Sequence, residues 1–190
     1  MMPNGQEVAS GLRGAWRLLR CDAGGMAAFD NSVDGFWKSF YAAVLTAPAY
    51  VIVVALHMPE GDPPGGFLHL LLIQVGSYVI EWVAYPLAAF YVVDMMGKSE
   101  SYIRFIVALN WSRVVQVPIY LPAVLLVAAD VFAPQVADLL TLITTAALLA
   151  YQWFVTRTAL AIPGMAAALL VALDVAISVL NVFVTDGLLA

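Results

Sequence analysis

Three ionisable residues, Glu81, Arg113 and Asp174, lie deep inside apolar segments of the sequence. Each lies about 10 to 14 residues from one end of its segment, which is roughly 15 to 20 Å along a helix. Ionisable side chains at such a depth in a membrane are costly, and they usually face a protein interior or a water-filled cavity. We therefore expect these three residues to meet near the midplane of a helical bundle.

Polar neighbours recur at helical spacing around these residues, which indicates the face that each helix turns toward the bundle interior. The stripes consist of Gln74, Tyr78, Glu81 and Tyr85; of Asn110, Arg113 and Gln116; of Thr141, Thr145, Gln152 and Thr156; and of Asp174, Ser178 and Asn181. We predict that Arg113 lies between Glu81 and Asp174 and shares hydrogen bonds with Asn110 and Asn181.

This intramembrane polar cluster has two interpretations. It is either a buried ionic lock that fixes the register of the helices, or a relay for protons or ions, or a solute-binding site. In the ionic lock, two carboxyls and one guanidinium carry a formal sum of −1, so one carboxyl is expected to be protonated at neutral pH. We expect the lock as the simpler arrangement and keep the relay as the alternative.

The composition indicates which elements position these residues. Hydrophobic residues make up 63% of the 190 residues, and charged residues only 11%. A soluble domain has about 25% charged residues, and a small domain cannot bury so much apolar surface. A soluble globular domain, a disordered chain and a nucleic-acid-binding protein are therefore excluded, and an all-α polytopic membrane protein is predicted.

Five apolar segments are long enough to cross a bilayer, since a spanning helix needs about 20 residues. They cover residues 38–58, 67–93, 102–129, 136–156 and 164–185 and together form the predicted transmembrane bundle, residues 38–190. Lysines and arginines lie only in alternate connections, which places the N-terminus in the cytoplasm and the C-terminus in the periplasm. We expect the inner membrane of a bacterium. Pro118 and Pro122 predict that the third span is divided into two helical segments.

Residues 1–37 are expected to form a cytoplasmic segment at the membrane surface. Within them, residues 8–21 have apolar and basic side chains at helical spacing, which predicts an amphipathic helix in the headgroup region. The predicted surface residues are Arg13, Trp16, Arg17 and Arg20, and their expected partner is anionic lipid.

Other kinds of chemistry have little support in the sequence. His57, Glu60, Asp62 and His69 lie around the connection after the first span, but they lack the tight spacing of metal ligands. The sequence has no nucleophile motif, phosphate-binding loop or dinucleotide fingerprint. We therefore expect no metal, no cofactor, no catalytic residues and a protein that is not an enzyme.

The layout resembles the bacterial branch of the Ypt-interacting-protein (Yip) domain superfamily. The resemblance rests on Phe29-Asp30, on Gly35-Phe36-Trp37-Lys38-Ser39-Phe40 ahead of the first span, and on Glu81-Trp82, Asn110-Trp111 and Tyr151-Gln152-Trp153-Phe154 within the spans. It implies a cytoplasmic N-terminal segment followed by a compact bundle of five spans. Bacterial proteins of this kind are inner-membrane proteins without a settled activity, so the resemblance bears on the fold.

These observations favour a non-enzymatic integral membrane protein that acts as a scaffold, an accessory subunit or a membrane-organising factor. Small residues between 146 and 168 allow close helix contacts within the chain or with a partner. A homo-oligomer or a subunit of a larger membrane complex is therefore expected. The alternative is a small transporter or channel for protons, ions or a small solute, which uses Glu81, Arg113 and Asp174.

Overall fold

The computed structural model describes residues 2–58 and 65–189, and all regular structure in these ranges is helical. Two short 3-10 helices are labelled η. The elements are α1 (Gly5–Leu19), η1 (Ala23–Ala28), α2 (Val33–Ser39), α3 (Tyr41–Leu56), α4 (Gly66–Met95), η2 (Ser99–Ser101), α5 (Tyr102–Ala128), α6 (Pro134–Leu160) and α7 (Gly164–Leu189).

Five helical stretches in the described residues are long and apolar enough to cross a membrane, namely Val33–Leu56, Gly66–Met95, Ser99–Ala128, Pro134–Leu160 and Gly164–Leu189. The all-helical class and the presence of five long apolar helices at the predicted positions are confirmed, and the chain is compatible with an integral membrane protein. The first stretch includes a junction at Phe40 between α2 and α3. The fourth stretch continues four residues beyond the predicted end at residue 156. Arg104 donates hydrogen bonds to the carbonyl of Ala159 and so satisfies one free acceptor of this last turn.

The prediction that the third span is divided is wrong. α5 is one continuous α-helix that contains both Pro118 and Pro122. A proline removes one hydrogen bond and crowds the carbonyl four residues earlier, but membrane helices tolerate this where neighbouring groups accommodate the freed carbonyl. Because the two prolines lie four residues apart, the missing hydrogen bonds fall on one face of the helix.

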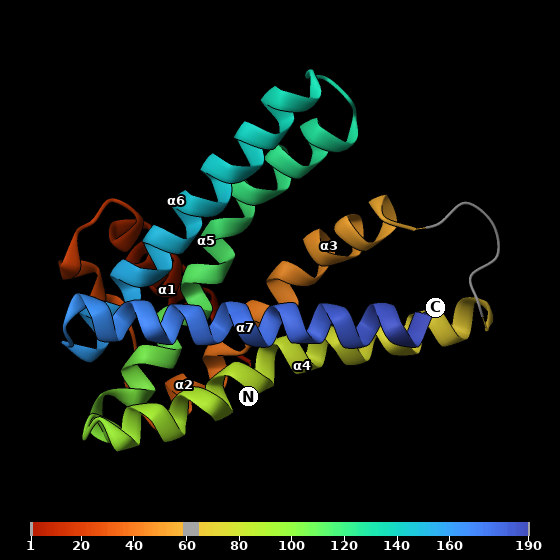
Figure 1. The fold of residues 1–190 in the computed structure, drawn as a ribbon. Helices are drawn as coiled ribbons and strands as arrows, with labels where there is room; N and C mark the ends of the chain where they lie inside the picture. The colour runs from red at the N-terminus through yellow and green to blue at the C-terminus, as the bar shows by residue number, and fades with distance from the viewer. Residues whose placement is uncertain (1, 59–64, 190) are drawn as a thin grey trace.

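The long helices form two pairs that diverge from each other. α4 packs against α7, and α5 packs against α6 (Figure 1). The pairs approach each other at the end where residues 161–163 connect α6 to α7, and they separate toward the opposite end. α3 packs against α5 and lies on the open side of this arrangement.

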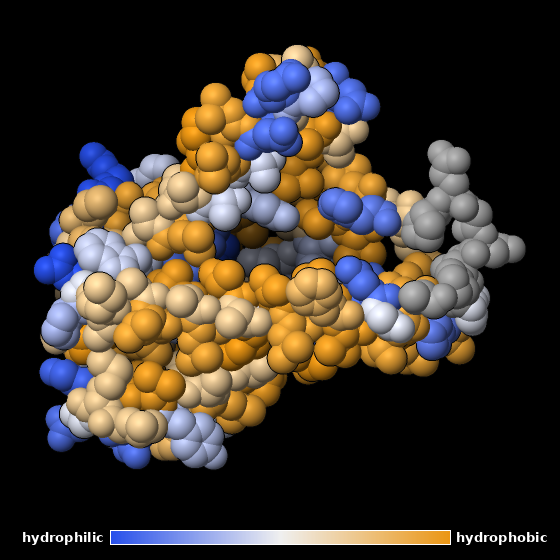
Figure 2. Space-filling view, in the orientation of Figure 1, coloured by the Kyte–Doolittle hydropathy of each residue, from blue (hydrophilic) through white to orange (hydrophobic). Residues whose placement is uncertain are grey.

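Large apolar side chains cover the outer faces of the diverging helices (Figure 2). They include Phe67, Leu72, Leu87 and Tyr91 on α4 and Met165, Leu169, Leu180 and Phe183 on α7, all of which are exposed. Soluble proteins rarely expose so many apolar side chains in contiguous patches, whereas helices that face lipid do so throughout. These faces therefore suit contact with acyl chains.

The hydrophobic core lies at the end where the two pairs meet, and the N-terminal segment completes it. Ala15 and Leu18 of α1 are fully buried, and α1 packs against α5. The Tyr151 hydroxyl of α6 donates a hydrogen bond of 2.8 Å to the carbonyl of Ala15. A helix therefore forms in the predicted region, but its buried face contacts the protein itself. Its placement at a lipid surface stays a prediction.

An ion-pair network joins α1 to α2. The Asn4 side chain accepts hydrogen bonds from the first turn of α1, and the Glu7 carboxylate accepts one of 2.7 Å from the Asn4 main chain. The same carboxylate accepts a hydrogen bond of 2.7 Å from Lys38, which also lies 2.7 Å from Asp34. Helix capping and the docking of α1 thus share one carboxylate.

Acid should weaken the ion pair between Glu7 of α1 and Lys38 of α2. The Lys38 ammonium and the Asn4 main-chain N–H hold the pKa of Glu7 below its ordinary value of 4.5. A carboxyl with a lowered pKa in the folded protein stabilises the fold above the unfolded-state pKa, and this stabilisation is lost as the pH falls through the folded-state pKa. We expect the melting temperature to fall as the pH is lowered from about 5.5 to about 3, and to fall less in Glu7→Gln. Glu100→Gln, at an exposed site, serves as the control. An equal fall in all three proteins would exclude this role of Glu7.

Candidate functional site

Arg113 and Asp174 form the central ion pair of the bundle. Their closest nitrogen and oxygen atoms are 3.3 Å apart, and the two side chains are 16% and 12% exposed. The Arg113 guanidinium also donates a hydrogen bond of 3.4 Å to the main-chain carbonyl of Glu81, and it lies 5.1 Å from the centre of the Trp82 ring. The contact with an aromatic face adds a cation–π interaction to the ion pair.

Asp174 has a second partner on α6. The Gln152 amide donates a hydrogen bond of 2.5 Å to the other carboxylate oxygen of Asp174. Gln152 belongs to the polar stripe of the fourth predicted span, so its polarity signals an inward face. The sequence does not indicate which group it contacts. The Asp174 carboxylate is thus held from α5 and from α6.

Glu81 is not an ion-pair partner of Arg113. Its carboxylate accepts a hydrogen bond of 2.5 Å from Ser178 and one of 3.4 Å from Asn181, and both donors are neutral. The Asn181 amide also donates to Ser77, over 3.0 Å to the hydroxyl oxygen. Among the described residues, no basic side chain lies within 4.0 Å of the Glu81 carboxylate. The structure therefore places the main-chain carbonyl of Glu81 beside Arg113 and the carboxylate of Glu81 beside α7.

Asn110 lies apart from this group. Its amide nitrogen donates a hydrogen bond of 2.9 Å to the Ser39 hydroxyl at the end of α2. Its side-chain oxygen is buried and has no hydrogen-bond partner among the described residues. Residues three apart on a helix are about 60° apart around its axis. This difference lets Asn110 face the N-terminal segment, while Arg113 faces α4 and α7.

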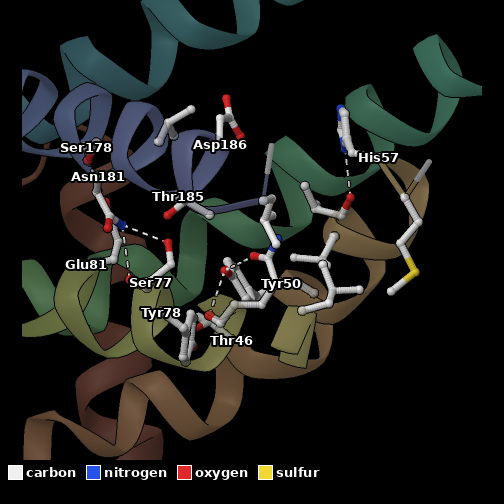
Figure 3. A pocket seen from close by; sticks show the side chains of 18 of the residues that line it. Thr46, Tyr50, His57, Ser77, Tyr78, Glu81, Ser178, Asn181, Thr185 and Asp186 are labelled. Carbon is white, nitrogen blue, oxygen red and sulfur yellow. Dashed lines mark hydrogen bonds between the residues drawn. The ribbon is translucent and has the colours of Figure 1, made fainter. Parts of the chain in front are cut away.

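A cavity of about 550 Å³ lies between α3, α4, α5 and α7 (Figure 3). Its polar lining residues are Thr46, Tyr50, His57, Gln74, Ser77, Tyr78, Glu81, Tyr120, Ser178, Asn181, Thr185 and Asp186. Apolar side chains such as Val54, Leu70 and Val117 form the rest of the wall. Figure 3 shows His57 at one end of this space and Glu81, with Ser178 and Asn181, at the other. The cavity is therefore an apolar chamber with a polar, acidic inner end.

Polar contacts fix the wall between α3 and α4. The Tyr78 hydroxyl lies 2.8 Å from the Thr46 hydroxyl and donates a hydrogen bond of 2.6 Å to the carbonyl of Ala43. The Tyr50 hydroxyl donates to the Gln74 side chain over 2.9 Å, and the rings of Tyr50 and Tyr78 are 4.5 Å apart. These contacts hold aromatic rings at the cavity wall. Thr46 and Tyr50 were not predicted as site residues, since α3 carries few polar side chains.

The two histidines near the first connection contact main-chain carbonyls. His57 Nδ1 lies 2.8 Å from the carbonyl of Val53, and His69 Nε2 lies 3.3 Å from that of Leu188. Glu60 and Asp62 lie outside the described residues. Within the residues that are described, no three His, Cys, Asp or Glu side chains gather as metal ligands.

The predicted surface residues lie on the exposed side of α1. Trp16 is 55% exposed, and Arg13 and Arg20 are exposed. Arg17 forms an ion pair of 2.7 Å with Asp22, and this guanidinium lowers the pKa of the Asp22 carboxyl. Arg17 thus has a partner within the protein, and contact of these side chains with anionic lipid stays a prediction.

No family model, curated protein or solved structure matches the chain.

Proposed function

We propose that this chain is a small, non-enzymatic membrane carrier that takes a solute into the cavity between α3, α4, α5 and α7. The observation that best supports this function is that the cavity extends to Glu81, near the middle of α4. Ligand sites are mostly apolar chambers with a few placed polar groups, and intramembrane ionisable residues usually mark solute or ion paths.

The Arg113–Asp174 pair supports access from one end of the bundle. The innermost lining residues on α5 and α7 are Val117 and Ser178, and the ion pair lies one helical turn beyond each of them. Arg113 and Asp174 are not among the residues that line the cavity. In this proposal the Arg113–Asp174 ion pair closes the inner end of the cavity, and the Glu81 carboxylate contacts the solute.

Orientation and assembly follow from the same proposal. The basic residues of α1 and α2 lie at the closed end, so the positive-inside rule assigns the cavity mouth to the periplasmic side of a bacterial inner membrane. Many carriers combine two structural repeats, and a chain with five spans would complete its pathway as a homo-oligomer.

A scaffold or accessory subunit is the second candidate. It is supported by the folded N-terminal platform formed by α1, η1 and α2, which leaves Arg13, Trp16 and Arg20 exposed at the closed end. Such a platform suits contact with a partner subunit or with the membrane surface. In that function the cavity has no solute to admit.

Cysteine accessibility in proteoliposomes tests the carrier. The chain has one cysteine, Cys21, which is exposed near the closed end and reports the orientation of the protein. In a Cys21→Ser background, we expect Val117→Cys in the cavity wall to react with a membrane-impermeant thiol reagent. The controls are Ala108→Cys, which is fully buried in the same helix, and Leu180→Cys on the outer face of α7, and neither should react.

An unreactive Val117→Cys in both orientations would exclude a solute-filled cavity. Stoichiometric co-purification of another chain in mild detergent, together with that result, would favour the scaffold.

A further inference from the structure

The charge balance around the cavity points to the kind of ligand. Among the described residues that line it, none is a lysine or an arginine, whereas two, Glu81 and Asp186, carry carboxylates. Arg113, the nearest guanidinium, contacts Asp174 and reaches only the main chain of Glu81. Among the described residues, the Glu81 carboxylate therefore accepts hydrogen bonds only from the neutral donors Ser178 and Asn181.

A carboxylate in this setting favours a cation beside it. Removing a charge from water is costly unless an opposite charge and hydrogen bonds compensate for it. The described lining of the inner end supplies the hydrogen bonds but no basic side chain, and the nearby Arg113 is paired with Asp174. An anion would meet repulsion from Glu81 and Asp186, and a neutral solute would leave the Glu81 charge uncompensated.

The walls indicate what must accompany that cation. Val54, Leu70 and Val117 offer apolar contact, and the rings of Tyr50 and Tyr78 lie between the mouth and the inner end. The volume of about 550 Å³ lies within the range of sites for drug-sized molecules. An inorganic ion would leave most of this apolar chamber empty.

We propose that the cavity binds an amphipathic organic cation, a protonated amine with an apolar body, whose ammonium group pairs with Glu81 while its body lies against α3 and α5. This inference rests on the proposed function and adds the chemical class of the solute. No covalent step is involved, and the amine enters already protonated, since alkyl amines have a pKa of about 10.

Three probes with one apolar body and different heads test this assignment: phenylbutylamine, phenylbutanol and phenylpentanoate. Binding is measured by calorimetry to the full chain in nanodiscs of neutral lipid, with empty nanodiscs subtracted. We expect the amine to bind about tenfold or more tighter than the other two, since hydrogen bonds to charged groups contribute on this scale. It should also slow thiol modification of Val117→Cys.

Variants at two carboxylates separate a site at Glu81 from a general preference for cations. Glu81→Gln should weaken amine binding about tenfold and leave phenylbutanol binding within about twofold. Glu81→Asp keeps the charge and should keep most of the preference. Asp186→Asn makes the same chemical change at the mouth and should have a smaller effect.

Equal affinity of the three probes, or an unchanged amine affinity in Glu81→Gln, would overturn the assignment to an organic cation. If Val117→Cys reacts with the thiol reagent but none of the probes binds, the assignment of an organic cation fails, whereas the proposed carrier function stands. If Val117→Cys is unreactive, the carrier itself fails.

Discussion

Replacing Arg113 by methionine is expected to lower the free energy of unfolding by about 3 kcal/mol, which is among the largest effects of any single substitution in this chain. The change removes the ion-pair partner of Asp174 but keeps an unbranched side chain in place of the aliphatic stem of the arginine. The Asp174 side chain is only 12% exposed, so its charge would remain at membrane depth with the Gln152 amide as its sole described partner. An uncompensated charge there costs more than the pair contributes when intact.

Reversible unfolding of the purified protein in mixed micelles, followed by circular dichroism, measures this effect. The double variant Arg113→Met/Asp174→Asn removes both charges and should recover at least half of the loss. Arg13→Met changes an exposed arginine of α1 and serves as the matched control. A loss below about 0.5 kcal/mol in Arg113→Met, the size of a typical surface effect, would exclude the ionic lock.

The second large effect is expected at Gly11, where α1 packs against α5. A Cβ added at Gly11 would lie 2.5 Å from an atom of the Trp111 ring. Trp111 is only 4% exposed, so the ring has little space into which it can move. Overpacking of this kind costs about 1 to 3 kcal/mol. Gly11→Ala should therefore destabilise the docking of α1 by about 2 kcal/mol, although alanine is the better helix former.

Limited trypsin digestion measures this docking, because Arg13, Arg17 and Arg20 become better substrates when α1 separates from α5 and unfolds. The matched control is Gly76→Ala inside α4, where an added Cβ has no neighbour within 4 Å. That change should leave cleavage at these arginines unchanged and should stabilise its helix by up to about 1 kcal/mol. Equal protection of Gly11→Ala and the unaltered protein would show that α1 does not rely on this contact.

The sequence predicts the spans well because each depends on local composition. A run of about 20 apolar residues must be a helix in lipid, since no other open structure satisfies its backbone there. The junction at Phe40 was not predicted, because residues on both sides of it are apolar or aromatic and continue the run. The two prolines of α5 led to the wrong prediction of a divided span, since local propensity does not include the support of neighbouring helices.

Helical periodicity predicts only part of the candidate site. It indicates the inward face of a helix, and Arg113 and Asp174, which both lie on such faces, are in contact in the structure. Periodicity does not specify which helices are neighbours. For this reason Asn110 was expected near Arg113 but bonds to Ser39, and Glu81 was expected to pair with Arg113 but meets Ser178. The cavity was also beyond prediction, because it arises from the divergence of two helix pairs.

The packing of α1 has a consequence for the order in which the protein folds. The Ala15 carbonyl accepts its hydrogen bond from Tyr151, 136 residues later in the chain, and Gly11 meets Trp111 on α5. α1 therefore leaves the ribosome before α5 and α6, and its binding surface does not exist until those two helices have been synthesised. At about 5 to 20 residues per second, the apolar face of α1 waits about 7 to 27 seconds until Tyr151 has been synthesised. During that interval the nascent helix needs another apolar surface, and the nearest one is the bilayer into which the following spans are inserted.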